Sequence, residues 1–310
     1  MECIAKSGVA TIAAVADENP EAAATAAAVA DAAIAAPSID DLLAHDLDGL
    51  VIATPSALHA DQSAAALASG LAVFCQKPLA RSGEETWRVI GAARAANRLL
   101  GVDLSYRHTR GMECVRRLVQ EDELGSVYAV DLTFHNAYGP DKAWFYDRKL
   151  SGGGCVIDLG IHLVDLAMWT LDFPRVADVT SRLWSKGAAL RSTEHEVEDY
   201  AVARLDLETG ATITLTCSWN LPAGRDALIS ASFYGTKGGA ALRNVNGSFY
   251  DFTAERYRGT STETLCAPPD DWGGRAAVDW AARLASGTRF DPSVEHIGDV
   301  ADALDRIYGR

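Results

Sequence analysis

The first third of the chain alternates short apolar runs with helical segments. Three apolar runs have the length of buried strands, and the segments between them carry helix signals such as a glycine stop and a Ser-x-x-Glu capping box. Alternating strands and helices predict an α/β domain with a parallel, doubly wound, Rossmann-type sheet. The predicted strands are 50–53, 72–75 and 99–104, and the predicted helices are 20–30, 56–69 and 82–97, with a further short helix capped by Ser38.

A different pattern begins after residue 106 and predicts a second domain. Apolar and polar residues alternate there as in half-buried antiparallel strands, and Glu208-Thr-Gly210 between two such runs is a hairpin signal. We expect a dinucleotide-binding domain over residues 1–104. Residues 105–310 should form an α+β domain, with a largely antiparallel sheet, for substrate binding and oligomerisation. Its predicted strands are 127–134, 200–207, 211–218 and 227–234, and its predicted helices are 112–120, 158–170 and 293–308.

The segment before residue 20 contains no GxGxxG loop, which normally follows the first strand of a dinucleotide fold. Residues 1–8 resemble the end of the helix after such a loop, and the run 9–17 then corresponds to the second strand. The sequence therefore predicts a sheet without its first strand, with an unpaired flank in its place. It also predicts weak or absent dinucleotide binding, because the helix N-terminus that neutralises the pyrophosphate is missing.

Asp17 ends this run, where a carboxylate usually accepts hydrogen bonds from the adenosine ribose. A carboxylate at this place favours NAD over NADP, because it repels a 2′-phosphate. The alternative is that Asp17 is a turn residue before Asn19-Pro20.

Polar residues also follow the ends of two predicted parallel strands. Thr54, Pro55 and His59 come after the run 50–53, and Lys77 comes after the run 72–75. Ligands of open α/β sheets bind at the carboxyl ends of the strands, so a nucleotide and its reaction partner should meet here. Lys77 can hydrogen-bond a hydroxyl and stabilise developing negative charge, although a Lys-Pro pair alone is common and usually structural.

The run GGGCVIDLGIHLVD at 152–165 is the second cluster of chemical interest. Asp158, His162 and Asp165 are spaced i, i+4, i+7, which places them on one helical face. The glycines leave room for a ligand or another backbone at the helix start. A carboxylate one turn away can orient the imidazole, which is suited to move a proton near neutral pH. A structural His–Asp pair and a zinc site are the alternatives, and without a third strong ligand nearby we expect no metal.

Taken together, segments 50–78 and 152–165 resemble the Gfo/Idh/MocA oxidoreductases, the family of glucose–fructose oxidoreductase, inositol dehydrogenase and related sugar and polyol dehydrogenases. The family's strand-end motif is Glu-Lys-Pro, and its second motif, Asp-x-Gly-x-His-x-x-Asp, matches residues 158–165 without exception. The resemblance implies that Lys77, Asp158 and His162 are catalytic. The chain departs from the first motif at Gln76, where a neutral amide replaces the acid before Lys77.

The resemblance also implies an activity. An NAD(P)-dependent oxidoreductase of this type passes a hydride between a carbinol carbon and the nicotinamide, with NAD preferred here. His162 would take the hydroxyl proton, Lys77 would polarise the oxygen, and Asp158 would orient one of these two. The implied cofactor contacts are Asp17, Thr54, Pro55, His59, Gln76 and Lys77.

Further polar and aromatic residues are candidates for contact with a sugar or polyol, because sugars often stack on aromatic rings among hydrogen-bond donors. Each of them alone can equally be a packing or loop residue. As a group near the expected catalytic helix they make a polyol pocket a working hypothesis. The candidates are Tyr106, Arg107, His135, Asn136, Tyr138, Trp144, Arg148, Trp219 and Asn220, together with Asp158 and His162.

Composition narrows the remaining classes. A formal net charge of -14 argues against nucleic acid as a partner, and six scattered cysteines without a CxxC pair fit a reducing compartment. No signal peptide and no membrane-spanning apolar run is visible, so we expect a cytoplasmic protein. The resemblance implies homodimers or homotetramers through the C-terminal sheet. Two other functions stay open: a catalytically impaired sugar-binding or regulatory protein, and a glycosidase that uses NAD.

Overall fold

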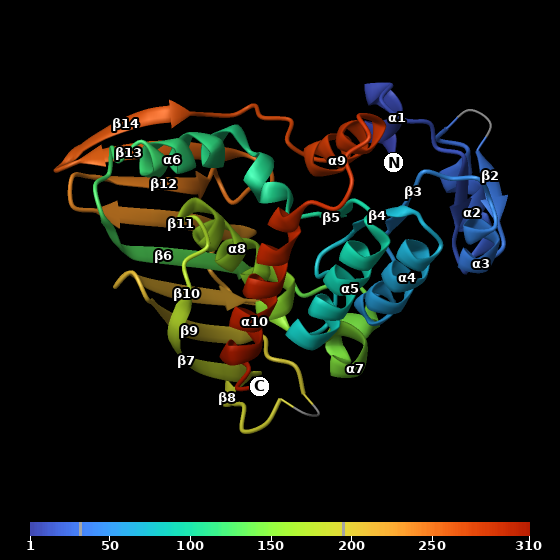
Figure 1. Ribbon diagram of the computed structural model, residues 1–310. Helices are drawn as coiled ribbons and strands as arrows, with labels where there is room; N and C mark the ends of the chain where they lie inside the picture. The colour runs from blue at the N-terminus through green and yellow to red at the C-terminus, as the bar shows by residue number, and fades with distance from the viewer. Residues whose placement is uncertain (31–32, 194–195) are drawn as a thin grey trace.

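The computed structural model describes residues 1–30, 33–193 and 196–310. Two units lie side by side: strands with flanking helices form one, and a large sheet forms the other (Figure 1). The elements of the first unit alternate as predicted. They are α1 (Glu2–Ser7), β1 (Ala14–Ala16), α2 (Pro20–Ala27), β2 (Ile34–Ala36), α3 (Ile39–Leu43), β3 (Gly49–Ile52), α4 (Ser56–Ala68), β4 (Ala72–Cys75), α5 (Gly83–Ala96) and β5 (Leu100–Val102).

All strand pairs of the first unit are parallel, which confirms the predicted arrangement. The strands form two separate sheets, with orders β1-β2 and β3-β4-β5. Within the described residues, β3 therefore has a hydrogen-bonded neighbour on one side only, and Val51 in its middle is 43% exposed. The predicted strand 9–17 was too long, since only Ala14–Ala16 is extended and paired.

Local signals explain where the helices of this unit begin and end. The Ser82 hydroxyl accepts the N–H of Glu85 at 3.2 Å, which confirms the predicted cap of α5. The Ser38 hydroxyl accepts the N–H of Asp41 in the same way and starts α3. Gly70 follows α4 with a φ of 82°, a left-handed conformation in which glycine lacks the Cβ penalty. The helices then bury residues such as Leu67 and Val89 against the strands.

The second unit is built on a nine-stranded sheet of order β14-β13-β12-β11-β6-β10-β9-β7-β8. Every neighbouring pair is antiparallel except β6 and β10, so the predicted, largely antiparallel sheet is confirmed. Its strands are β6 (Val127–Asn136), β7 (Val176–Ser185), β8 (Ala188–Ala189), β9 (Tyr200–Leu207), β10 (Thr212–Ser218), β11 (Ala227–Gly235), β12 (Gly239–Asn244), β13 (Phe252–Arg258) and β14 (Ser261–Cys266).

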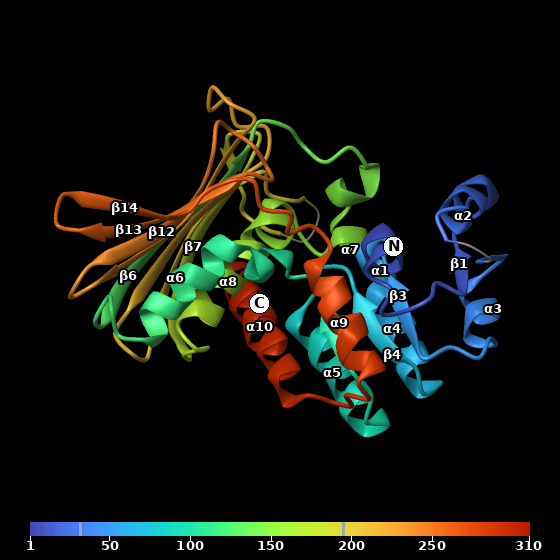
Figure 2. The same cartoon turned by 90° about the horizontal axis from the view of Figure 1, so that it is seen from above.

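Helices lie against one face of this sheet (Figure 2). Alternation along the strands separates the two faces: Leu205 and Leu215 are buried under the helices, whereas Val202 and Arg204 point to the other side. The helical segments are η1 (Ser105–His108), α6 (Arg110–Gln120), η2 (Ala143–Tyr146), α7 (Arg148–Ser151), the π-helix η3 (Val156–Gly160), α8 (Ile161–Thr170), α9 (Arg275–Ala285), η4 (Pro292–Glu295) and α10 (His296–Ile307).

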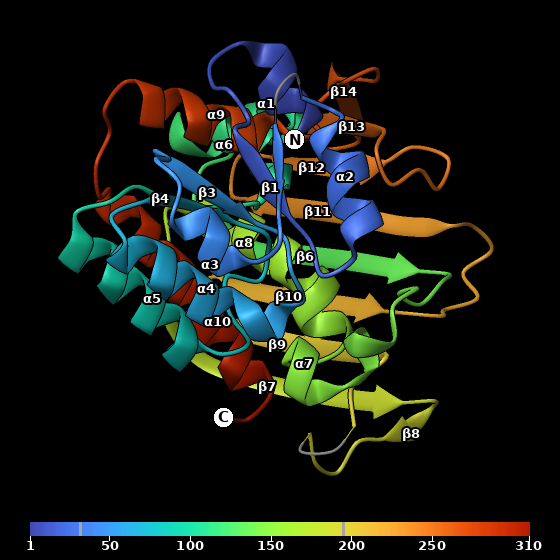
Figure 3. The same ribbon diagram turned by 90° about the vertical axis from the view of Figure 1, so that its right-hand side faces the viewer.

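The last two helices connect the units. α9 packs on the first unit, where the Trp280 ring lies 5.7 Å from the Phe74 ring. A Cβ on either Gly49 or Gly101 would lie only 2.8 Å from Trp280, so these strand glycines make room for the indole. α10 lies between α5 and the large sheet (Figures 1 and 3). Two helices from far beyond residue 104 thus pack against the first unit.

One helical stretch, Arg148–Thr170, is long and apolar enough to cross a bilayer by length and composition. Its most apolar part is 89% buried inside the protein, as expected for a core helix.

Candidate active site

A cavity of about 170 Å³ lies at the carboxyl ends of β3 and β4. This is the edge of the sheet where ligands bind in open α/β folds. Several predicted residues from both units meet here. The cavity is lined by Ala53, Thr54, Ser56, His59, Gln76, Lys77, Pro78, Trp144, Phe145, Ser151, Ile157 and Asp158.

The central contact of this cavity joins Lys77 to Asp158. Lys77 Nζ lies 2.6 Å from Asp158 Oδ1 and 2.7 Å from the Asp158 backbone oxygen. The two side chains are 18% and 15% exposed, so the pair is largely screened from water. Asp158 thus holds the ammonium from two directions. Among the described residues, its carboxylate is hydrogen-bonded to Lys77 and Trp219 and not to His162.

The second carboxylate oxygen of Asp158 has its own donor. Trp219 Nε1 donates to Asp158 Oδ2 at 3.0 Å from the end of β10. Both oxygens of Asp158 are therefore occupied, which fixes the carboxylate plane. Trp219 also meets the η2 loop, where Phe145 and Tyr146 pack edge-on against its ring.

Asp158 lies in a π-helix, not in the first turn of a regular α-helix as the sequence predicted. The π-helix covers Val156–Gly160 and leads directly into α8. Short π-helical turns are frequent at functional sites because the extra residue per turn redirects side chains. The residues at 158, 162 and 165 accordingly do not share one partner.

The start of this π-helix is held by Glu198, a residue that no motif in the sequence marks. Glu198 is fully buried, and its carboxylate accepts the N–H groups of Gly154 and Val156 at 2.9–3.1 Å. The hydroxyl of Tyr308 also donates to it at 2.8 Å. Burial raises the pKa of Glu198, and these hydrogen bonds oppose that shift. A carboxylate at the N-terminal end of a helix also interacts favourably with the helix dipole.

Close packing around Glu198 explains two of the three glycines, Gly153 and Gly154. A Cβ on Gly154 would lie 1.9 Å from the Glu198 backbone oxygen, and a Cβ on Gly153 would lie 2.1 Å from the Tyr308 hydroxyl. The glycine run predicted a close approach by a ligand or a backbone, and the structure shows a backbone together with a ring.

His162 lies one turn beyond Asp158, only 9% exposed. Its ring packs on Tyr106, with centroids 4.9 Å apart, and its Nδ1 has no hydrogen-bond partner among the described residues. Burial, and then the positive charge of Lys77, hold the pKa of His162 well below its usual range. The imidazole is therefore neutral near pH 7, and it lies behind the residues that line the cavity rather than among them.

Asp165 serves a different partner. It is fully buried and binds Arg107 through both of its oxygens, with Arg107 Nε 2.7 Å from Oδ2. The guanidinium also stacks over the Phe173 ring at 5.3 Å. Burial raises the pKa of Asp165, and Arg107 acts in the opposite direction. The structure thus places Arg107 in an internal ion pair and outside the cavity lining.

His59 connects the two turns that border the cavity. It is buried, and its ring nitrogens lie 2.6 Å from the Thr54 oxygen and 2.7 Å from the Pro78 oxygen. Burial lowers its pKa. The Thr54 hydroxyl donates to Gln62 at 2.6 Å, and Pro55 starts α4 without a side-chain cap. The first backbone N–H groups of α4 are thus free of side-chain caps at the cavity edge.

Two further predicted cofactor contacts lie at strand ends. Gln76 lines the cavity and donates its amide N–H to Asp103 at 2.7 Å. Asp17 follows β1, is exposed, and accepts the N–H of Asn19 at 2.9 Å, as a turn residue does. The ribose role of Asp17 stays a prediction.

The candidate substrate residues lie in several different places. Trp144 lines the cavity and stacks on Phe145 with ring centroids 3.9 Å apart. Tyr106 lies behind His162 in the core. His135 points to the opposite face of the large sheet, where it contacts Ser218 at 2.8 Å, because it alternates with the core residue Phe134. Arg148 does not line the cavity, and its Nε is buried without a partner in the described chain.

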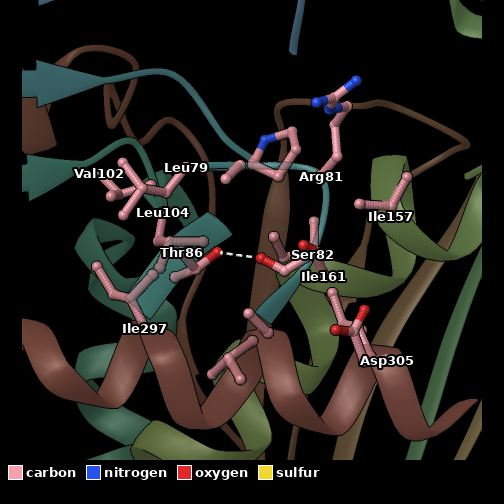
Figure 4. A pocket seen from close by; sticks show the side chains of 15 residues that line it. Leu79, Arg81, Ser82, Thr86, Val102, Leu104, Ile157, Ile161, Ile297 and Asp305 are labelled. Atoms are coloured by element: carbon pink, nitrogen blue, oxygen red, sulfur yellow. Dashed lines mark hydrogen bonds between the residues drawn. The ribbon is translucent and has the colours of Figure 1, made fainter. Parts of the chain in front are cut away.

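A second, smaller cavity lies behind the π-helix. Its volume is about 20 Å³, room for roughly one water molecule. Ile157 and Ile161 border it on one side and Ile297 of α10 on another, with Ser82 and Thr86 at the start of α5 (Figure 4). Its walls are mostly aliphatic, so it belongs to the packing between α5, α10 and the π-helix.

The donor set suits the nicotinamide end of a dinucleotide. Thr54, Gln76 and Lys77 offer polar groups beside the uncapped start of α4, and Trp144 offers an aromatic wall. The described residues contain no group of three or more His, Cys, Asp or Glu side chains that could hold a metal ion.

A parallel α/β unit with a cavity at its strand ends, where its Lys77 pairs with Asp158 of a second unit, is the arrangement of two-domain α/β oxidoreductases. Residues 3–104 match the family model described as "Oxidoreductase family, NAD-binding Rossmann fold". Residues 112–241 match the "GFO/IDH/MocA C-terminal domain". The chain belongs to the Gfo/Idh/MocA family, as its motifs predicted.

Individual relatives agree with this assignment. D-glucoside 3-dehydrogenase of Escherichia coli (strain K12) is 29% identical over 65% of this chain and 60% of the relative, so the chain spans about three fifths of that protein's length. The uncharacterised oxidoreductase YrbE of Bacillus subtilis (strain 168) is 28% identical, and the match covers 83% of this chain and 81% of the YrbE chain. The structure of GenD2 from gentamicin A biosynthesis, in complex with NAD, superposes with a TM-score of 0.79 at 25% identity, covering 96% of this chain and 87% of that one.

Proposed function

We propose that this chain is an NAD-dependent dehydrogenase that interconverts a hydroxyl group of a sugar or polyol with the corresponding carbonyl. The observation that carries the proposal is the contact of Lys77 with Asp158, two residues 81 positions apart that meet in a cavity at the strand ends. The NAD complex of GenD2 and the sugar named in D-glucoside 3-dehydrogenase support the choice of cofactor and substrate class.

The chain's own residues have separate tasks. Lys77 holds the substrate oxygen and stabilises negative charge on it, while Asp158 and Trp219 keep the ammonium in place. His162, neutral because of its burial, accepts the hydroxyl proton in the oxidation direction. When bound, NAD supplies the hydride chemistry. Trp144 and Phe145 supply an aromatic wall of the cavity.

The test is a panel of polyols and aldoses with NAD and NADP, measured on the parent protein and on Lys77→Met. We expect NADH formation with at least one polyol, and a loss of about 10²–10³-fold in kcat/KM for K77M. Lys149→Met is the matched control, because Lys149 is exposed on the neighbouring α7. Equal activity of K77M and K149M would overturn the proposed role of Lys77.

The same panel separates the other two functions. Sugar binding without any NADH formation would support a binding or regulatory protein, and release of a glycoside product without net NADH would support a glycosidase. The intact Lys77–Asp158 pair favours the dehydrogenase over the binding protein.

We further propose a cytoplasmic homo-oligomer that pairs through the uncovered face of the large sheet. On this uncovered face, Val202 and Tyr200 lie among side chains that are mainly Thr, Ser and charged residues. Such a mixed face fits association with a second copy.

A further inference from the structure

Gln76 and Asp103 occupy the ends of two neighbouring parallel strands. Gln76 follows β4, and its backbone N–H donates to the Ile52 oxygen at 2.8 Å. Asp103 follows β5, and its backbone N–H donates to the Cys75 oxygen at 2.9 Å. The backbone ladder thus continues one residue beyond each strand and brings the two side chains together. Gln76 Nε2 then donates to Asp103 Oδ2 at 2.7 Å.

Asp103 determines which end of the Gln76 amide faces it. An ionised carboxylate only accepts hydrogen bonds, and the NH₂ group of an amide only donates them. The Nε2 end must therefore point to β5, which leaves the carbonyl oxygen Oε1 for another partner. Gln76 also lines the cavity beside Lys77. The other oxygen of Asp103, Oδ1, is buried without a hydrogen-bond partner in the described part of the chain.

An acid at residue 76 would be incompatible with this arrangement. Two carboxylates within hydrogen-bond distance repel each other unless they share a proton. The family motif carries Glu before the lysine, whereas this chain carries Gln there and a carboxylate on the next strand. The substitution at 76 and the acid at 103 are thus physically coupled.

We propose that Asp103 is a positioning residue that orients the Gln76 amide, so that Oε1 is presented to the ligand in the cavity as a hydrogen-bond acceptor. Asp103 supplies from β5 the negative charge that the family motif supplies from residue 76. The ligand group that fits is a hydrogen-bond donor, either the amide of a nicotinamide or a sugar hydroxyl. The inference rests on the proposed function.

The test is a double-mutant cycle of Gln76→Glu, Asp103→Asn and the combination Q76E/D103N. Q76E should lower the melting temperature by about 3–8 °C, because it places two carboxylates together. The double variant should recover most of this loss, because the amide introduced at position 103 can donate to the carboxylate introduced at position 76. D103N alone should leave the melting temperature nearly unchanged but weaken ligand binding by roughly three- to tenfold, because Gln76 is then free to turn. Gln120→Glu, at an exposed position on α6, is the control for added charge.

Binding is read in two arms: NADH affinity by fluorescence titration, and KM for the best polyol. A loss in the NADH arm assigns the donor to the nicotinamide amide, and a loss in the polyol arm assigns it to a sugar hydroxyl. Additive melting effects of Q76E and D103N would overturn the pairing, and coupled melting with no change in either arm would overturn the positioning role. If the parent binds no NADH, the proposed function fails. The Gln76–Asp103 pairing is then still tested by the melting temperatures of the variants.

Discussion

A single indole nitrogen positions the charged pair at the centre of the cavity. Trp219→Phe keeps the ring packing but removes the donor to Asp158 Oδ2. We expect the free energy of unfolding to fall by about 1–2 kcal/mol, because the lost bond is to a charged group that is partly reached by water. The kcat should fall while the affinity for NADH stays unchanged. Urea denaturation and steady-state kinetics measure these effects. Trp184→Phe on β7 is the control, and identical kinetics in both variants would contradict the role of Trp219.

His162 gives a prediction for pH. Burial lowers the pKa of His162 in the folded protein, so below about pH 6.5 the unfolded chain binds a proton that the folded one does not. The free energy of unfolding is therefore unaffected by this titration above pH 6.5, and it falls as the pH falls below that value. When the pH is lowered from 7.5 to 5.0, the free energy of unfolding should fall in both proteins. In His162→Gln the fall should be smaller than in the parent, by up to about 2 kcal/mol. Parallel stability curves for the two proteins, from urea denaturation at each pH, would contradict this.

At the scale of elements, the π-helix depends on a residue from outside it. Glu198→Gln replaces a carboxylate that accepts from Gly154, Val156 and Tyr308 with an amide whose NH₂ cannot accept. We expect a loss of about 2–4 kcal/mol in the free energy of unfolding. Faster amide hydrogen exchange at residues 154 and 156 should accompany it. Glu196→Gln, at an exposed position two residues earlier, is the control, and equal stability of the two variants would show that the cap is dispensable.

Local signals allowed many elements to be predicted, although not the π-helix or α9, and they did not predict the contacts between elements. Ser82 and Glu85 lie three residues apart, so their cap could be read from the sequence. The Lys77–Asp158 contact spans 81 residues, and only the resemblance to a family placed both in one site. Glu198 lies among other acidic residues, and nothing nearby marks it as buried. The glycines at 152–154 did require a close neighbour, but they could not name it.

At the scale of the whole molecule, the uncovered face of the large sheet predicts association. Val202 aligns there with Thr216 on one side and Arg182 on the other. We expect the parent to be a dimer or tetramer by light scattering at micromolar concentration, and Val202→Lys to be a monomer, because an unpaired charge is costly inside an interface. Leu58→Lys on α4 makes the same change elsewhere and should leave the assembly intact. A monomeric parent would contradict the proposal.

The return of α9 to the first unit has a consequence for synthesis on the ribosome. Phe74 and Ala72 share a buried apolar cluster with Trp280 and Ala281 of α9, so part of their cover arrives only with that helix. At roughly 5–20 residues per second, about 10–40 s pass between the emergence of β5 and that of α9. During this interval one side of the nascent parallel sheet lacks its helix, and chaperones that bind apolar segments have a defined place and time to act. The first unit therefore gains this cover after the strands of the second unit have been synthesised, since α9 follows β14 in the chain.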